Sequence, residues 1–141
     1  MPAQPRILVI DDDETILDLL KDTLTPDYYI ATAHDSLEGV ELMMSERFDL
    51  MIIDLGMPVL DGVELIQKIR ANSPFDKIPI LVLSAYPELR TRLKGSDVQA
   101  IMAKPFSIDQ LQRTVARIIE GEPGITANAG VPPSSPPSTP S

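Results

Sequence analysis

The sequence predicts an α/β fold, a single doubly wound sheet of five parallel strands with helices on both faces. Short apolar runs of strand length alternate with segments in which apolar residues recur every three or four positions, the spacing of amphipathic helices. Such alternation is typical of β-α units, and right-handed crossovers between them place the carboxyl ends of all strands at one edge of the sheet. Ligands of open α/β sheets bind at that edge.

The first two β-α units occupy the first third of the chain. The apolar run at 6–10 and the β-rich stretch at 28–33 are the expected strands. We expect Ser36 to cap the second helix, whereas Asp13 and Glu14 lie near the positive end of the first. The expected apolar faces consist of Ile16, Leu19, Leu20 and Leu24 in the first helix, and of Leu37, Val40, Met43 and Met44 in the second.

The third strand is the continuous apolar run Leu50–Ile53, which we expect to be buried on both faces. Asp54 ends this run, and turn-forming glycines and a proline follow it. The next helix should direct Val63, Ile66 and Ile69 inward. A carboxylate therefore stands where a buried strand leaves the sheet.

The last two strands are expected at residues 79–83 and 98–103. Ser84 ends the fourth strand, and Lys104-Pro105 follows the fifth. Between them, residues 88–94 are expected to form a short helix.

The final helix begins at Ser107, which forms a capping box with Gln110, and it ends at Gly121. Residues 122–141 contain six prolines and no Lys, Arg or aromatic residue, so they cannot bury enough apolar surface to offset their ordering entropy. We therefore expect one domain, residues 1–121, followed by a disordered Pro/Ser-rich tail. The residues that the final helix should bury are Leu111, Val115, Ile118 and Ile119.

Composition argues against several classes of function. The net charge of −9 disfavours non-specific binding to nucleic acid or to an anionic membrane. The chain has no cysteine, hence no disulfide or thiol chemistry, which fits a reducing compartment. Its first residues lack the pattern of a signal peptide, and no apolar run approaches the length of a membrane span. We expect a soluble cytoplasmic protein.

Chemically useful side chains follow four of the five expected strands. They are Asp11 and Asp12 after the first strand, Asp54 after the third, Ser84 after the fourth and Lys104 after the fifth. Carboxylates at close range need a counter-charge to stay ionised, and Mg²⁺ prefers carboxylate oxygens. The lysine balances the acids and can contact a phosphoryl oxygen. A carboxylate that attacks phosphorus gives an aspartyl-phosphate.

Four motifs stand at these strand ends, in the order I-L-V-I-D-D-D, M-I-I-D-L-G-M-P-V-L-D-G, L-V-L-S-A and A-K-P-F. Together they resemble the receiver domain of two-component response regulators, over roughly Pro5 to Gly121. The resemblance implies a flavodoxin-like fold with strand order 2-1-3-4-5. It also implies a cis peptide bond between Lys104 and Pro105.

The resemblance implies a role for each residue at the sheet edge. Asp54 falls on the phosphoacceptor position, Lys104 on the phosphate-contacting lysine and Ser84 on the switch hydroxyl. Mg²⁺ would bind Asp12 directly and Asp11 through water. The complete set of implied metal ligands is Asp11, Asp12, Asp54 and the main-chain carbonyl of Gly56.

The implied function is phosphorelay signalling. A sensor histidine kinase or phosphotransfer protein would pass its phosphoryl group to Asp54, and phosphorylation would switch binding to a downstream protein partner. Such a domain catalyses its own phosphorylation and slow hydrolysis but is no turnover enzyme. Ile101 stands where the family usually has Tyr or Phe, and the segment from Ser84 to Lys104 is slightly short. In the family, this aromatic side chain swings inward when the switch hydroxyl shifts toward the phosphoryl group. We hypothesise that Tyr86 supplies such an aromatic in this chain.

Two alternatives compete with this interpretation. Residues 11–15 also spell D-x-D-x-T, which resembles the first motif of haloacid-dehalogenase-type phosphatases and would make Asp11 the nucleophile. That enzyme would leave Asp54 without a role. The second alternative is a receiver-shaped adaptor that takes no phosphate. His34, the sole histidine, is expected to be a surface loop residue rather than a ligand.

Overall fold

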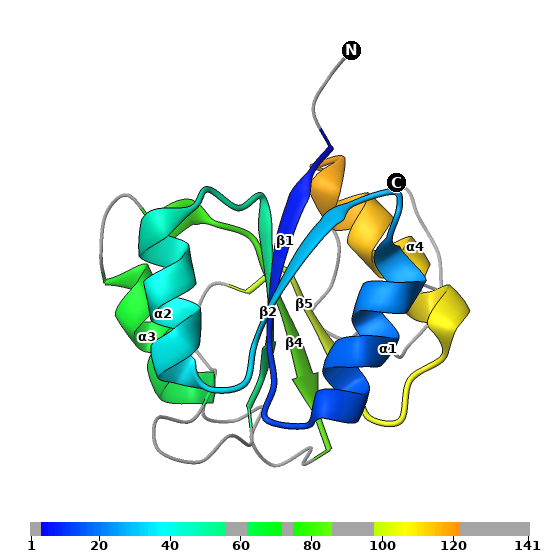
Figure 1. The fold of residues 1–141 in the computed structure, drawn as a ribbon, viewed down its shortest axis with the longest axis horizontal. Helices are drawn as coiled ribbons and strands as arrows, with labels where there is room; N and C mark the ends of the chain where they lie inside the picture. The colour runs from blue at the N-terminus through cyan, green and yellow to red at the C-terminus, as the bar shows by residue number, and fades with distance from the viewer. Residues whose placement is uncertain (1–3, 56–61, 72–74, 86–97, 122–141) are drawn as a thin grey trace, which may run out of the picture.

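The computed structural model describes residues 4–55, 62–71, 75–85 and 98–121 (Figure 1). Its five strands form one parallel sheet in the order β2-β1-β3-β4-β5, as the sequence predicts. The strands are β1 (Arg6–Ile10), β2 (Tyr29–Ala33), β3 (Leu50–Asp54), β4 (Ile80–Ser84) and β5 (Ala100–Ala103). The helices are α1 (Glu14–Leu24), α2 (Ser36–Ser45), α3 (Gly62–Arg70), the short 3-10 helix η1 (Phe75–Lys77) and α4 (Ile108–Ile119).

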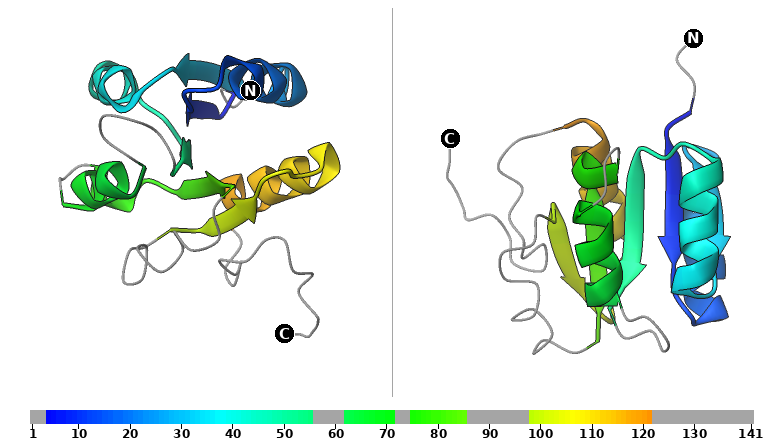
Figure 2. Two further views of the ribbon diagram at one scale, coloured as in Figure 1. Left: turned by 90° about the horizontal axis from the view of Figure 1, so that it is seen from below. Right: turned by 90° about the vertical axis from the view of Figure 1, so that its left-hand side faces the viewer.

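Helices cover both faces of the sheet, so the predicted doubly wound arrangement is confirmed (Figure 2). On one face α1 and α4 pack against side chains such as Val9, Ile52 and Leu83. On the other face α2 and α3 pack against Leu8 and Ile53 together with their strand neighbours. Alternate residues of each strand feed the two cores, because successive side chains point to opposite faces.

The ends of the helices follow the expected capping chemistry with one correction. Asp35, not Ser36, is the N-cap of α2: its carboxylate accepts a hydrogen bond from the main-chain N–H of Glu38. Ser36 is the first residue of the helix and is fully buried. At α4 the predicted N-cap is confirmed, since Ser107 accepts from the N–H of Gln110, and Gly121, just past the end of the helix, has a positive φ of 72°.

Two apolar faces were predicted partly wrongly. Helix α1 buries Leu17, and Leu19 lies on its exposed flank. In α2 the expected core residues Leu37 and Met44 are 63% and 71% exposed. The stripe that α2 buries is Ser36, Gly39 and Met43, at positions i, i+3 and i+7. Two of these residues are not large and apolar, so the hydrophobic pattern misplaces this face.

Some expectations lie outside the described residues. These are the short helix at 88–94 and the structure of 122–141; the side chain of Val63 is also undescribed. In the described part of the chain, no helix is both long and apolar enough to cross a bilayer.

The close contact between α2 and β1 generates the first prediction. A Cβ added at Gly39 would collide with Cδ1 of Ile10 and lie 2.9 Å from its Cγ1. Overpacking of this kind costs about 1–3 kcal/mol, whereas the higher helix propensity of alanine over glycine stabilises the fold by up to about 1 kcal/mol. We expect Gly39→Ala to lower the free energy of unfolding by about 1–2 kcal/mol in urea titrations.

The partner substitution Ile10→Val removes Cδ1 and should restore part of this loss in the double variant. Glu41→Ala, on the exposed side of α2, is the matched control and should change stability little. A Gly39→Ala protein as stable as the wild type would show that the helix can move away without cost.

Candidate functional site

The register of the sheet brings together the four strand ends that carry candidate site residues. Ile10 pairs with Ile53, Asp54 with Leu83 and Ser84 with Ala103. The residues that end or follow these strands therefore share one edge. Figure 2 (left) looks onto this edge from below.

Lys104 connects the acids from two strands. Its Nζ lies 3.0 Å from Oδ2 of Asp11 and 3.4 Å from Oδ1 of Asp54. Its main-chain N–H donates to the carbonyl of Ser84 at 2.8 Å, which ties the end of β5 to the end of β4. The Lys104-Pro105 peptide bond is cis, as the resemblance implies.

The protonation of Lys104 follows from its neighbours. Its side chain is 18% exposed, and burial pulls its pKa down. The ion pairs with Asp11 and Asp54 outweigh burial, so the pKa is raised overall. The amine is therefore protonated at neutral pH.

Asp11 is the most enclosed acid of the group. It has no exposed surface, and its Oδ1 accepts a hydrogen bond from the N–H of Asp13 at 2.9 Å. Burial raises its pKa, and the charge of Asp54 raises it further. The hydrogen bond from Asp13 and the ammonium of Lys104 act in the opposite direction but do not cancel the rise. Ionised Asp11 is thus held at an energetic cost.

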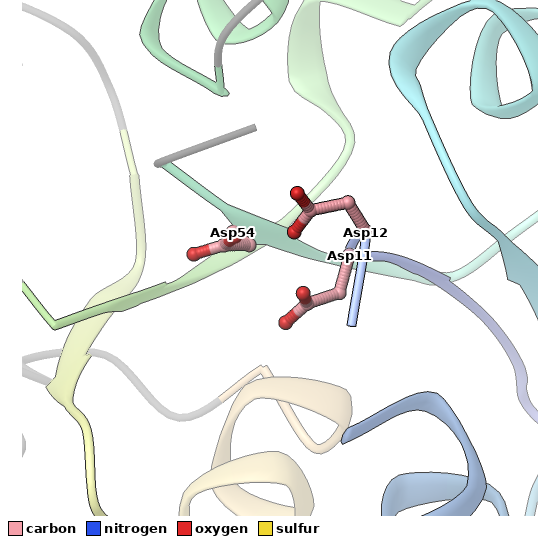
Figure 3. Close-up of side chains that lie close together, drawn as sticks. All are labelled: Asp11, Asp12 and Asp54. Carbon is pink, nitrogen blue, oxygen red and sulfur yellow. The ribbon is translucent and has the colours of Figure 1, made fainter. Parts of the chain in front are cut away.

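Three carboxylates converge beside this ammonium. Asp11, Asp12 and Asp54 each place one oxygen within 4.8 Å of the others' (Figure 3). Asp11 and Asp12 come from the loop after β1, and Asp54 comes from the end of β3. Asp12 is exposed, whereas Asp54 is 7% exposed.

This donor set fits a hard divalent cation. Mg²⁺ prefers carboxylate oxygens as ligands, and one oxygen of each acid lies within 4.8 Å of the others. Three carboxylates and one ammonium leave an excess of negative charge that a cation would offset. The acid cluster thus offers the type of ligand atom and the negative charge that magnesium requires.

The structure describes some of the remaining candidate residues but not all of them. Ser84 is buried at the end of β4, next to the strand that carries Asp54. Gly56, the implied carbonyl ligand, and Tyr86, the hypothesised moving aromatic, lie outside the described residues. Ile101 is a buried core residue in the middle of β5, opposite Val82.

Sequence reasoning missed a contact of His34. The ring is exposed, as expected, but it lies between Glu14 of α1 and Glu38 of α2, 3.0 Å from each carboxylate. The spacing of His34 and Glu38, four residues apart, was a signal for one of these contacts. Nothing in the sequence pointed to the contact with Glu14, which depends on how the start of α1 lies against the β2–α2 connection.

Comparison with known proteins decides the family. Residues 7–116 match the response regulator receiver domain. The chain belongs to this family. It is a receiver domain of two-component phosphorelay signalling, and its architecture is that of the family.

Known relatives carry receiver domains in different contexts. The sensor histidine kinase TmoS of Ectopseudomonas mendocina is 41% identical over 82% of this chain and 12% of its own length. The response regulator MprA of Mycobacterium ulcerans is 38% identical over 75% of this chain and 46% of its own length. The chain thus spans half or less of these curated relatives.

A solved receiver structure extends the comparison to the fold. The response regulator TrrA of Thermotoga maritima, in complex with Mg²⁺-BeF, superimposes with a TM-score of 0.71 and is 32% identical. The match covers 81% of this chain and 98% of TrrA.

The raised pKa of Asp11 predicts a pH dependence of stability. Above the ordinary carboxyl pKa of 3.8, the unfolded chain releases a proton that native Asp11 still holds. Stability of the metal-free receiver therefore falls as pH rises from 3.8 through the native pKa, and the loss persists at neutral pH. Asp11→Asn should remove this loss and be more stable than the wild type at neutral pH.

Urea unfolding with a chelator present, at several pH values from acid to neutral, measures this effect. Asp109→Asn alters an exposed carboxylate on α4 that pairs with Arg113, and it serves as the control. Equal stability of Asp11→Asn and the wild type at neutral pH would contradict the direction of the pKa shift.

Proposed function

We propose that Asp54 accepts the phosphoryl group in this receiver domain. The observation that carries the proposal is the meeting of three carboxylates with the Lys104 ammonium at one sheet edge. Asp54 ends the fully buried strand β3, so its carboxylate is held in place by the core. It is also close enough to Lys104 for a phosphoryl group bound to it to meet the ammonium.

In this proposal an oxygen of Asp54 attacks phosphorus with its lone pair. The P–N bond of a phosphohistidine donor breaks, the imidazole nitrogen keeps the electron pair and takes up a proton from water, and an aspartyl-phosphate forms. Lys104 contacts one phosphoryl oxygen, and the Ser84 hydroxyl donates to another. Hydrolysis later returns Asp54 and inorganic phosphate, so the domain acts as a switch.

We further propose that Mg²⁺ is held by Asp11, Asp12, Asp54 and the main-chain carbonyl of Gly56. Bound there, the cation would neutralise charge on the carboxylates and on the phosphoryl oxygens. The acid cluster fits such an ion, and TrrA of the same family was solved with Mg²⁺-BeF.

The proposed partners are a sensor histidine kinase or phosphotransfer protein as donor and a protein that reads the phosphorylated state. Cytoplasmic histidine kinase domains would place this receiver in the cytoplasm. The proposed organisation is a domain at 1–121 and a Pro/Ser-rich tail at 122–141. Residue 101 is an isoleucine that packs in the core. The proposed readout therefore uses no aromatic side chain at that position.

Labelling with acetyl phosphate tests the proposed phosphoacceptor. We expect Mg²⁺-dependent phosphorylation of the wild type by intact-protein mass spectrometry, and none in Asp54→Asn. Lys104→Ala should label more slowly by about tenfold or more, because one charge-stabilising contact is lost. Asp109→Asn is the matched control and should label as the wild type does.

The same experiment separates the proposal from the phosphatase alternative, which the family assignment does not favour. A haloacid-dehalogenase-type enzyme would lose its covalent phosphate in Asp11→Asn and keep it in Asp54→Asn. Failure of the wild type to label under any of these conditions would instead support the adaptor alternative.

Metal binding is tested separately with Asp12→Asn, because Asp12 is exposed and its replacement spares the core. Calorimetry should give Mg²⁺ binding to the wild type and a Kd about tenfold or more higher in the variant. At a Mg²⁺ concentration of about ten times Kd, the wild type should gain about 1.4 kcal/mol in unfolding free energy. A variant that gains as much as the wild type would remove Asp12 from the ligand set.

A further inference from the structure

His34 bridges the beginnings of two helices. Its Nε2 lies 3.0 Å from Oε2 of Glu14, the first residue of α1. Its Nδ1 lies 3.0 Å from Oε1 of Glu38 in the first turn of α2. The main-chain N–H of His34 donates to the same Glu38 oxygen at 2.7 Å. One exposed side chain thus joins α1 to α2.

The geometry favours a doubly protonated ring. Ionised carboxylates only accept hydrogen bonds, so a ring that donates to both acids at once carries a hydrogen on each nitrogen. A neutral imidazole has one N–H and would direct a lone pair at the second carboxylate. The two charged groups that face the ring, Glu14 from α1 and Glu38 from α2, are both acidic. The hydrogen bond and charge of Glu38, with a smaller part from Glu14, raise the pKa of His34.

The bridge spans the loop that carries two of the candidate metal ligands, Asp11 and Asp12. At one end of this loop the N–H of Asp11 donates to the carbonyl of Ala33 at 3.1 Å. At the other end Glu14, which follows Asp13, is held by the ring of His34. Two consecutive residues, Ala33 at the end of β2 and His34 just after it, therefore attach both ends of the loop, and Asp12 lies between the attachments.

We propose that His34, as an imidazolium, is a positioning residue that holds the Asp11–Asp13 loop in the arrangement that binds Mg²⁺. The inference rests on the proposed magnesium site. His34 touches neither the metal nor the phosphoryl group. It acts through Glu14, by fixing the start of α1 against the β2–α2 connection.

A positioning role and a pure charge effect predict opposite results. Removing a positive charge near a cation site should strengthen Mg²⁺ binding, because a repulsive charge is lost. Loss of the attachment should weaken binding, because the loop must then be ordered when the ion binds. The sign of the change in Kd therefore distinguishes the two.

The first measurement needs no metal. Since His34 is the sole histidine, its ring signals in a proton NMR titration are assigned without mutation. The pKa should lie above the ordinary value, and Glu14→Gln and Glu38→Gln should each lower it. A wild-type pKa at or below the ordinary value would overturn the proposal, as would titrations of both variants that match the wild type.

The second measurement is calorimetry of Mg²⁺ binding near neutral pH. His34→Ala should raise the Kd about threefold to tenfold, at or below the lower end of the range for residues that orient metal ligands directly, because His34 acts through Glu14. Glu41→Gln alters an exposed acid of α2 away from the bridge and is the control. An unchanged or lower Kd in His34→Ala would overturn the inference while leaving the magnesium site intact. A wild type that binds no Mg²⁺ would overturn the proposed function and this inference with it.

A pH series completes the test. As pH rises through the pKa of His34, the wild type should lose its affinity advantage over His34→Ala, because the neutral ring cannot hold both carboxylates. The acid cluster is present in both proteins, so the ratio of their Kd values reports what His34 adds. A ratio of Kd values that stays constant across this range would show that the bridge does not depend on protonation, and would overturn the proposal.

Discussion

The repulsion between Asp11 and Asp54, and its compensation by Lys104, is the constraint on which this structure depends. The two acids are almost fully buried and lie at the ends of the adjacent strands β1 and β3, so neither can relax into solvent. Water cannot screen them, and the ammonium within 3.4 Å of both is the compensating charge that the described residues provide. A third acid, Asp12, leaves the balance negative. The metal-free domain therefore carries an excess of negative charge, which protonation of Asp11 or a bound cation would reduce.

The sheet makes this unfavourable arrangement possible. Strand β3 is buried along its whole length, and its neighbours are packed from both faces by two separate cores. The apolar contacts of these cores offset the cost of bringing like charges together. The sheet thus fixes the position of the site, whereas loops supply two of its charged side chains. The strands decide where Asp54 lies, and the loops after β1 and β5 bring Asp11 and Lys104 to it.

The sequence predicted the sheet and the meeting of its polar ends because both follow from strong local signals. Buried strands such as 50–54 are continuous apolar runs, and parallel topology then brings their ends to one edge. It failed for the inner face of α2, because the buried stripe contains Gly39 and Ser36, which carry no hydrophobic signal. The sequence also showed no sign of the contact between His34 and Glu14, since a contact between residues far apart in the chain leaves no trace in local periodicity.

The three acids of the site differ in their exposure. Asp11 and Asp54 are enclosed by the protein, while Asp12 faces water. A charged group that approaches from solution therefore meets Asp12 before the two buried carboxylates. Asp12 is thus the acid on which the surroundings act most directly, whereas Asp11 and Asp54 interact with each other and with Lys104.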